Sequence, residues 1–231
     1  MPTPTDRPNN LPALQRRHAL GSLAAAPLGA LALPAGVSAQ GAGRTATPTQ
    51  SLGPFYPRNA AERPRETDAD LVGTQGDRVL ARGTPLYLTG RVLNRAGRPL
   101  PGAEVEIWQC DANAVYHHPA GGAETERDPH FQGYGRTVAD GAGAFHFRTI
   151  RPVPYPGRTP HIHVRVAAAG HAPLASQLYL RGEAGNARDF LFRRLNEPER
   201  DAISLDLRAS ESGHPLARGT RLTASIELVL A

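Results

Sequence analysis

Residues 103–108 read Ala-Glu-Val-Glu-Ile-Trp, and residues 160–166 read Pro-His-Ile-His-Val-Arg-Val. In the first stretch apolar and polar side chains alternate, which is the period of a β-strand that buries one face. The second stretch has the same strand-like texture and runs on to residue 167. Both stretches therefore predict strands, and the rest of the chain follows the same pattern.

Further short strands are expected on both sides of these two stretches. Strand-like patterns occur at residues 86–93, 135–139, 144–149, 176–180 and 222–230. The sequence Asp-Gly-Ala-Gly at residues 140–143 indicates a hairpin turn, and residues 186–195 are the best helix candidate. Many short strands at intervals of roughly ten residues predict an all-β fold, an antiparallel β-sandwich with long loops and one short helix.

The composition excludes several classes of protein. The 231 residues carry 26 basic and 21 acidic side chains, a net charge of +5, and every basic residue is arginine. This charge is mild and dispersed, whereas a nucleic-acid surface needs clustered charge, so no nucleic-acid partner is expected. Hydrophobic residues, at 40%, suffice for a core. The single cysteine, Cys110, excludes an intrachain disulfide framework and a cysteine-rich metal site.

Residues 1–39 have the pattern of an export signal. Arg16 and Arg17 precede an Ala-, Gly- and Leu-rich run that ends in Val-Ser-Ala at residues 37–39, a small-residue cleavage pattern. The arginine pair favours the twin-arginine route, which carries folded proteins, and hence a bacterial periplasm. The alternative is a retained anchor, but the run contains two prolines and barely spans a bilayer core of about 30 Å.

The mature chain is expected to have two parts and no stable membrane span. Residues 40–83 are rich in Pro, Arg and Asp and show little periodicity, which predicts an extended arm. Residues 84–231 hold all the expected strands and form the sandwich domain. A homo-oligomer is compatible with this organisation, but the sequence does not specify one.

Two histidines and two tyrosines form a candidate metal site. His161 and His163 are two residues apart in a strand, so their side chains face the same way, roughly 6–7 Å apart along the chain. Tyr155 lies in a loop with prolines on both sides, which hold it rigid. Tyr116 follows Trp108 by eight residues, at the expected end of a strand. Taken singly, such a histidine pair is more often structural, and such a tyrosine is more often a packed aromatic.

Taken together, these four side chains indicate a particular kind of metal. Deprotonating a phenol at neutral pH costs about 4 kcal/mol, which a strongly Lewis-acidic cation can supply. Zinc sites usually use His, Cys and carboxylates, whereas two phenolates favour a harder trivalent ion. We therefore predict one non-haem Fe(III) ion per chain, with Tyr116, Tyr155, His161 and His163 as its ligands.

The order of several short strings resembles that of a known family, the intradiol ring-cleavage dioxygenases, and most closely its protocatechuate 3,4-dioxygenase branch (the beta-chain type). The strings are VEIWQ at 105–109, Tyr116, DPHF at 128–131, FRTIRP at 147–152, PYP at 154–156, Arg158, His161, His163 and SQLY at 176–179. Residues 47–56, TPTQSLGPFY, also resemble an N-terminal segment of that family. The resemblance covers residues 47 to about 183.

The resemblance implies a fold, a reaction and residue roles. The family fold is a β-sandwich with one Fe(III), and the four residues above match its ligands. Arg158 matches an arginine beside the substrate, and Gln177 matches a glutamine that lines the site. The family inserts both atoms of O₂ into a catechol between its hydroxyl-bearing carbons, giving a muconate-type dicarboxylic acid. Tyr155 matches the ligand that accepts a catechol proton, while the guanidinium of Arg158 is suited to stabilise developing negative charge.

The sequence leaves two alternative functions open, and one residue departs from the family pattern. The strands also resemble a transthyretin-like or carboxypeptidase-regulatory binding module, which does no redox chemistry. A divalent-metal hydrolase is the other alternative, but it lacks the expected Asp or Glu base beside the histidine pair. Gly157 stands where protocatechuate enzymes have a tryptophan, so a pocket wall is missing or rebuilt. The substrate is therefore expected to be a catechol-type ring whose substituents the sequence does not name.

Overall fold

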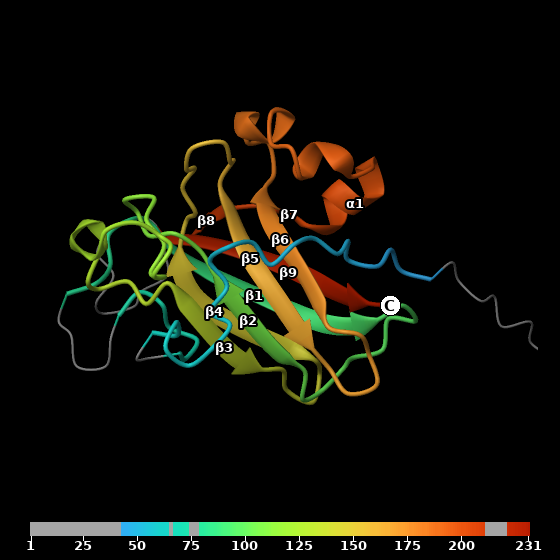
Figure 1. Cartoon of the computed structure of the whole chain (residues 1–231). Helices are drawn as coiled ribbons and strands as arrows, with labels where there is room; N and C mark the ends of the chain where they lie inside the picture. Colours follow the sequence, from blue (N-terminus) through green and yellow to red (C-terminus); the bar gives the residue numbers. More distant parts are fainter. Residues whose placement is uncertain (1–42, 65–66, 74–78, 211–220) are drawn as a thin grey trace, which may run out of the picture. The chain divides into compact units, whose positions relative to one another are not determined.

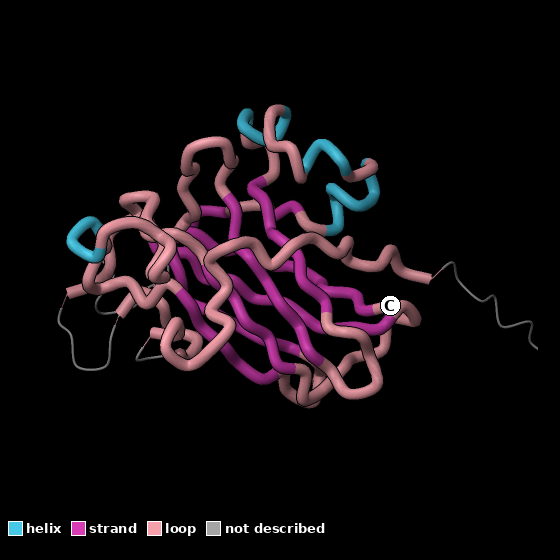
Figure 2. Tube along the Cα trace, viewed as in Figure 1, coloured by secondary structure: helices cyan, strands magenta, loops and turns pink. Residues whose placement is uncertain are grey.

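The computed structural model describes residues 43–64, 67–73, 79–210 and 221–231. The predicted export signal at residues 1–39 lies outside these ranges. In the described residues the strands form two sheets, shown as two magenta layers in Figure 2. The four-stranded sheet has the order β4 (Ala144–Ile150), β1 (Pro85–Asn94), β9 (Arg221–Leu230) and β8 (Arg208–Ser210). The five-stranded sheet has the order β3 (Tyr134–Val138), β2 (Glu104–Trp108), β5 (His161–Ala167), β6 (Leu174–Leu180) and β7 (Ser204–Leu205).

The hydrophobic core lies between the two sheets, and alternation along each strand builds it. In β5 the side chains of Ile162, Val164 and Val166 are completely buried in the same cluster as Leu86 and Leu88 of β1. Burying a side chain of this size contributes about 1.5–3 kcal/mol. Because successive strand residues point to opposite faces, His161 and His163 then lie on the outward face of the five-stranded sheet.

The predicted all-β sandwich is confirmed, and two strand pairs differ from a purely antiparallel arrangement. β1 pairs with β9 in parallel, as does β6 with β7, whereas the other pairs are antiparallel. A parallel pair needs a long crossover connection. The chain between β1 and β9 provides one, since it contains the whole five-stranded sheet.

The predicted hairpin at residues 140–143 is wrong. The turn does form, because the Asp140 carboxylate accepts hydrogen bonds from the backbone N–H groups of Ala142 and Ala144, both at 2.8 Å. However, β3 pairs with β2 in one sheet and β4 pairs with β1 in the other. Local turn chemistry reverses the chain, but burial of Phe145 and Phe147 against the core decides which strand β4 joins.

The predicted helix at residues 186–195 is also wrong. That segment holds two short 3₁₀ turns, η2 (Ala184–Ala187) and η3 (Phe192–Arg194). Between them the Asp189 carboxylate accepts from backbone N–H groups, which competes with helical hydrogen bonding. The helix, α1 (Glu197–Ala202), starts immediately afterwards, where Asn196 and Glu199 form a capping box. Another 3₁₀ turn, η1, spans Glu124–Glu126. None of the helices in the described part of the chain has the length and apolarity to span a membrane.

Residues 43–64 contain no strand or helix and run along the sandwich as an extended segment, blue to cyan in Figure 1. The backbone N–H of Thr47 donates to Val229 of the four-stranded sheet, and that of Gln50 donates to Ala175 of the five-stranded sheet. The segment then crosses the outward face of the five-stranded sheet, where the Tyr56 ring packs on Trp108. The histidines of β5 are therefore covered from the solvent side.

Candidate functional site

The five-stranded sheet sets its site residues in two neighbouring rows. In the first row Trp108 of β2 lies opposite His163 of β5, which lies opposite Gln177 of β6. In the second row His161 lies opposite Tyr179. Because all of these positions have the same parity along their strands, the side chains share the outward face of the sheet. The register alone therefore brings Gln177, which the family resemblance assigns to the site, beside the histidine pair.

Two loops bring the tyrosines to the same place. Tyr116 lies in the loop after β2 and not at a strand end, contrary to the prediction, and Tyr155 lies in the loop after β4. The ring centroids of Tyr155 and His161 are 5.5 Å apart, and those of Tyr116 and His163 are 6.1 Å apart. The two tyrosine rings are 5.6 Å apart, and the two imidazoles are 4.9 Å apart. The four predicted ligand residues thus converge.

The atoms that face one another have the chemistry of a metal site. The Nε2 atoms of His161 and His163 are 3.3 Å apart. Two metal–nitrogen bonds of about 2.1 Å, meeting at about 90–110°, hold their nitrogens about 3.0–3.4 Å apart. The Nδ1 of His161 lies 2.7 Å from the Thr159 carbonyl oxygen, which can only accept, so Nδ1 carries the proton and Nε2 keeps its lone pair. The buried Tyr116 hydroxyl has no hydrogen-bond partner in the described structure. These residues fit a cation.

Burial sets the protonation states of the four residues. It lowers the pKa of His161 to about 4, with help from the Arg158 charge, and it lowers the pKa of His163 well below the ordinary value. Both imidazoles are therefore neutral at pH 7, as metal ligands must be. Burial also raises the pKa of Tyr116 well above 10 and raises that of Tyr155. The protein alone keeps both phenols protonated, so a phenolate there requires a bound cation.

Arg158 lies at the edge of this cluster and is firmly held. Its side chain is 9% exposed, and its Nη1 lies 3.4 Å from the Tyr155 hydroxyl. Its Nη2 donates to the Gln177 side-chain oxygen and lies 3.3 Å from the Tyr179 hydroxyl. The third nitrogen, Nε, donates to Asp189 at 2.8 Å. The structure therefore joins the predicted Arg158 and Gln177 in one network beside Tyr155.

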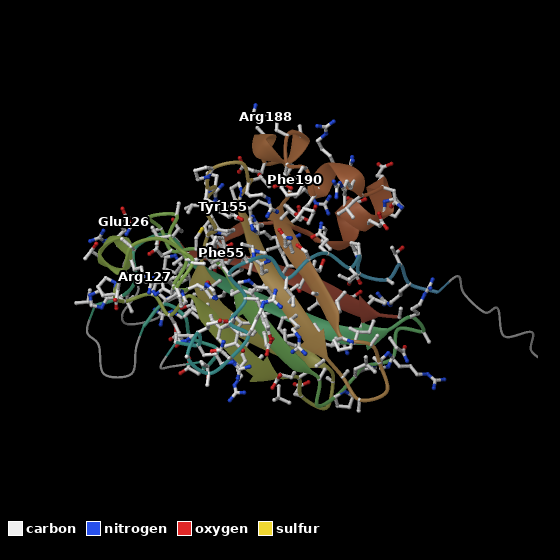
Figure 3. The ribbon with its side chains drawn as sticks, in the orientation of Figure 1. Phe55, Glu126, Arg127, Tyr155, Arg188 and Phe190 are labelled. Carbon is white, nitrogen blue, oxygen red and sulfur yellow. The ribbon has the colours of Figure 1, made fainter. Side chains whose placement is uncertain are left out.

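The N-terminal segment packs against the same cluster. The Phe55 ring stacks on Tyr116 with centroids 4.2 Å apart, and the His163 ring stacks on Trp108 with centroids 4.8 Å apart. On the side of its Cε1 atom, His163 meets Gly53, where an added Cβ would lie 3.3 Å from that atom. Figure 3 labels Phe55 and Tyr155 near the outward face of the sheet, with Phe190 above them in the segment after β6. Residues 53–56 are therefore part of the site.

Sequence reasoning missed two residues of this network. Tyr179 could have been found, because it lies two positions after Gln177 in a strand and must share its face. Asp189 had a weaker signal, a lone acidic residue before the apolar residues 190–192. The buried Asp189 carboxylate contacts the loop that leads to His161, but both of its oxygens already accept hydrogen bonds. It is not placed to act as the general base of a hydrolase.

Comparison with known proteins identifies relatives of this chain. A sequence model of the family described as Dioxygenase matches residues 52–221. The protocatechuate 3,4-dioxygenase beta chain of Burkholderia cepacia is 31% identical over 172 residues, which cover 70% of this chain and 73% of that protein. The catechol 1,2-dioxygenase of Candida albicans is 27% identical over 58% of this chain, which spans only 46% of that relative.

A solved structure extends the comparison to the fold. The dioxygenase domain of a dioxygenase carbohydrate-binding protein fusion from Streptomyces sp. SirexAA-E superposes with a TM-score of 0.56 at 32% identity. The match covers 80% of this chain and 98% of that domain. Because the family model matches most of the chain and a 31% identical relative is covered over 73% of its length, the chain belongs to the intradiol ring-cleavage dioxygenase family.

Proposed function

We propose that this chain is a non-haem Fe(III) dioxygenase that cleaves a catechol-type ring between its two hydroxylated carbons with O₂. The product is a muconate-type dicarboxylate. The observation that carries this proposal is the convergence of Tyr116, Tyr155, His161 and His163, with the two Nε2 atoms 3.3 Å apart. A binding module without redox chemistry has no use for two neutral imidazoles and two phenols around one point.

The four converging residues would hold the iron. Two phenolates and two imidazoles form a hard donor set that suits a ferric ion. When bound, the ferric ion withdraws electron density from a chelated diol, so that a ring carbon becomes reactive toward O₂. The remaining steps depend on groups that this chain supplies.

The two tyrosines have different surroundings, which supports different roles. Tyr116 is 3% exposed and stacks under Phe55, so its position is fixed. Tyr155 is only partly buried, on a loop between exposed prolines, and its hydroxyl faces the guanidinium of Arg158. A phenolate at this position would be able to accept one of the protons that a catechol loses on binding. Tyr155→Phe should therefore slow turnover, and an unchanged rate in that variant would remove this role.

Arg158 supplies fixed positive charge beside the reacting ring. Its guanidinium is held by Gln177, Tyr179 and Asp189, so it needs no reorganisation when negative charge develops on the substrate. A preorganised cation in a buried setting stabilises such charge far more than the same cation in water. Gln177 keeps Arg158 at the substrate side of the sheet.

The substrate side of the site is open at Gly157. An added Cβ there would meet nothing within 4 Å, so no side chain closes the loop at this position. Relatives of this chain act on protocatechuate and on catechol, by their names. We propose a catechol-type substrate whose ring substituents extend past Gly157.

Oxygen uptake with a panel of aryl diols tests this proposal. Iron-loaded protein should be red-brown from tyrosinate-to-iron charge transfer and should consume one O₂ per diol. The matched control is the same protein loaded with zinc, which should be colourless and inactive. A colourless iron-loaded protein, or one that consumes no O₂ with any diol, would refute the proposal.

We also propose that the protein is exported by the twin-arginine route. This rests on Arg16, Arg17 and the small-residue pattern at residues 37–39. Replacing both arginines with lysine should keep the full-length protein in the cytoplasm of a bacterial host. Periplasmic recovery of that variant at the wild-type level would exclude this route.

A further inference from the structure

Asp189 is a buried carboxylate that takes no part in the chemical steps of the proposed reaction. It lies between η2 and η3 and is 1% exposed, whereas the next residue, Phe190, is 53% exposed. A buried carboxylate is costly unless it is paired and hydrogen-bonded. The contacts of Asp189 therefore indicate what it does in this fold.

The two oxygens of Asp189 serve two different parts of the chain. Oδ1 accepts from the backbone N–H groups of Leu191 and Phe192, at 3.0 and 3.1 Å, within its own turn. Oδ2 accepts from Nε of Arg158 at 2.8 Å and from the backbone N–H of Thr159 at 3.2 Å. All four contacts are donors, so the carboxylate ties the turn after β6 to the loop before β5.

A second contact holds the same two segments together. The Thr159 hydroxyl donates to the Asn186 side-chain oxygen at 3.0 Å, and the Asn186 amide donates to the Leu180 carbonyl at 2.8 Å. The turn around Asp189 is therefore fixed to the end of β6, and Asp189 meets Arg158 from a rigid position.

This contact determines the direction of the Arg158 guanidinium. The guanidinium is planar and rigid, so a fixed partner at Nε limits the directions in which its two terminal nitrogens can point. Here those nitrogens face Tyr155, Gln177 and Tyr179, at the edge of the candidate site. The Phe190 ring covers the same guanidinium at 5.4 Å from its central carbon. Figure 3 shows Phe190 and Tyr155 on neighbouring loops at the same end of the sandwich.

We propose that Asp189 is a positioning residue, which aims the guanidinium of Arg158 at the reacting ring by occupying its Nε. This inference rests on the role of Arg158 in the proposed function. The hydrogen bonds of Asp189 reach none of the four candidate ligand residues, so we expect it to act on the reaction mainly through Arg158.

Asp189→Asn is the informative substitution. An amide has one acceptor oxygen and one NH₂ group, so whichever way it turns, the NH₂ faces two donors. We expect kcat to fall about 10- to 100-fold, since small displacements of a positioned group have effects of this size. KM and iron content should change much less. The control is Asp70→Asn, because Asp70 also pairs with an arginine, through Nη1 of Arg148 at 2.8 Å, and accepts from a backbone N–H, but it lies on the other sheet and is 43% exposed. That control should keep the wild-type kcat.

A double-mutant cycle separates positioning from general structural support. If Asp189 acts through Arg158, then Asp189→Asn should add no further loss of kcat to Arg158→Ala. Losses that multiply in the double variant, or a wild-type kcat in folded Asp189→Asn, would overturn the proposal. Should Asp189→Asn not fold, Asp189→Glu replaces it in the same cycle, because it keeps the charge but displaces the carboxylate by one methylene.

A readout without turnover keeps this test distinct from that of the proposed function. In metal-free wild-type protein, the Nε–H proton of Arg158 should exchange slowly with water by NMR, and Asp189→Asn should speed this exchange about tenfold or more. Equal exchange rates in the two proteins would show that Asp189 does not hold Arg158. If instead the exchange rates show that Asp189 holds Arg158, but the wild-type protein consumes no diol, the proposed function is wrong and the contact between Asp189 and Arg158 still stands.

Discussion

Replacing Gly53 with alanine is the sharpest test of how the site is built, because the added methyl group would lie too close to the His163 ring. Gly53 has φ of +74°, and an added Cβ would lie 3.3 Å from Cε1 of His163. A comfortable carbon–carbon contact is about 3.5–4.0 Å, so the imidazole must move by a few tenths of an ångström. That ring stacks on Trp108 with centroids 4.8 Å apart and an angle of 9°, so it has little freedom to tilt.

The expected cost of Gly53→Ala has two parts. A residue with a Cβ loses about 1–2 kcal/mol at positive φ, and overpacking a filled site costs about another 1–3 kcal/mol. Gly102→Ala is the matched control, since Gly102 has φ of +75° and an added Cβ there meets nothing within 4 Å. The two variants share the backbone cost, so their difference isolates the contact with His163.

The measurement is urea unfolding of metal-free protein, followed by competition for iron with a chelator. Gly53→Ala should be at least about 1 kcal/mol less stable than Gly102→Ala. It should also lose about 10- to 100-fold in iron affinity, as is typical when the support of a ligand is disturbed. Equal stability and equal iron affinity in the two variants would refute the claim that Gly53 makes room for His163.

Three further predictions follow from the site. His161→Ala should reduce bound iron to a minor fraction by metal analysis, and full occupancy would contradict its assignment as a ligand. Arg158→Ala should still bind catechol but turn over about 100-fold more slowly, and a wild-type rate would remove Arg158 from the mechanism. The stability of metal-free protein should fall as pH drops from 7 to 4, because unfolded His161 binds a proton near 6.5 whereas folded His161 does so only near 4. This pKa shift contributes about 3 kcal/mol to the free energy of unfolding at pH 7. In His161→Gln, the free energy of unfolding measured in urea should therefore fall less between pH 7 and pH 4 than in wild type, and an equal fall in the two proteins would contradict the shift.

Several parts of the fold were accessible from the sequence because they depend on neighbours in the chain. Alternation at residues 103–108 and 160–167 predicts β2 and β5, and it also places His161 and His163 on one face. The same parity argument, applied to residues 177 and 179, would have added Tyr179 to the site. The lone turn at residues 140–143 could not predict its strand partners, because pairing is decided by burial between distant segments.

In the loops, local sequence patterns predicted the wrong structure at two places. A helix was predicted at residues 186–195, but Asp189 binds the backbone N–H groups of its own turn together with the side chain of Arg158, 31 residues earlier in the chain. Tyr116 was assigned to a strand end, although it reaches the site from a loop. In both places a contact between remote residues outweighs the local pattern.

By itself the sequence determined the strand period, the shared face of the two histidines and the family order of the site residues, since these depend on spacing along one chain segment. Only the tertiary structure decided that Tyr116 and Tyr155 meet those histidines, and that Asp189 occupies Nε of Arg158. Convergence of this kind depends on how two sheets and their covering loops pack, and packing free energy is shared among residues that no local pattern connects.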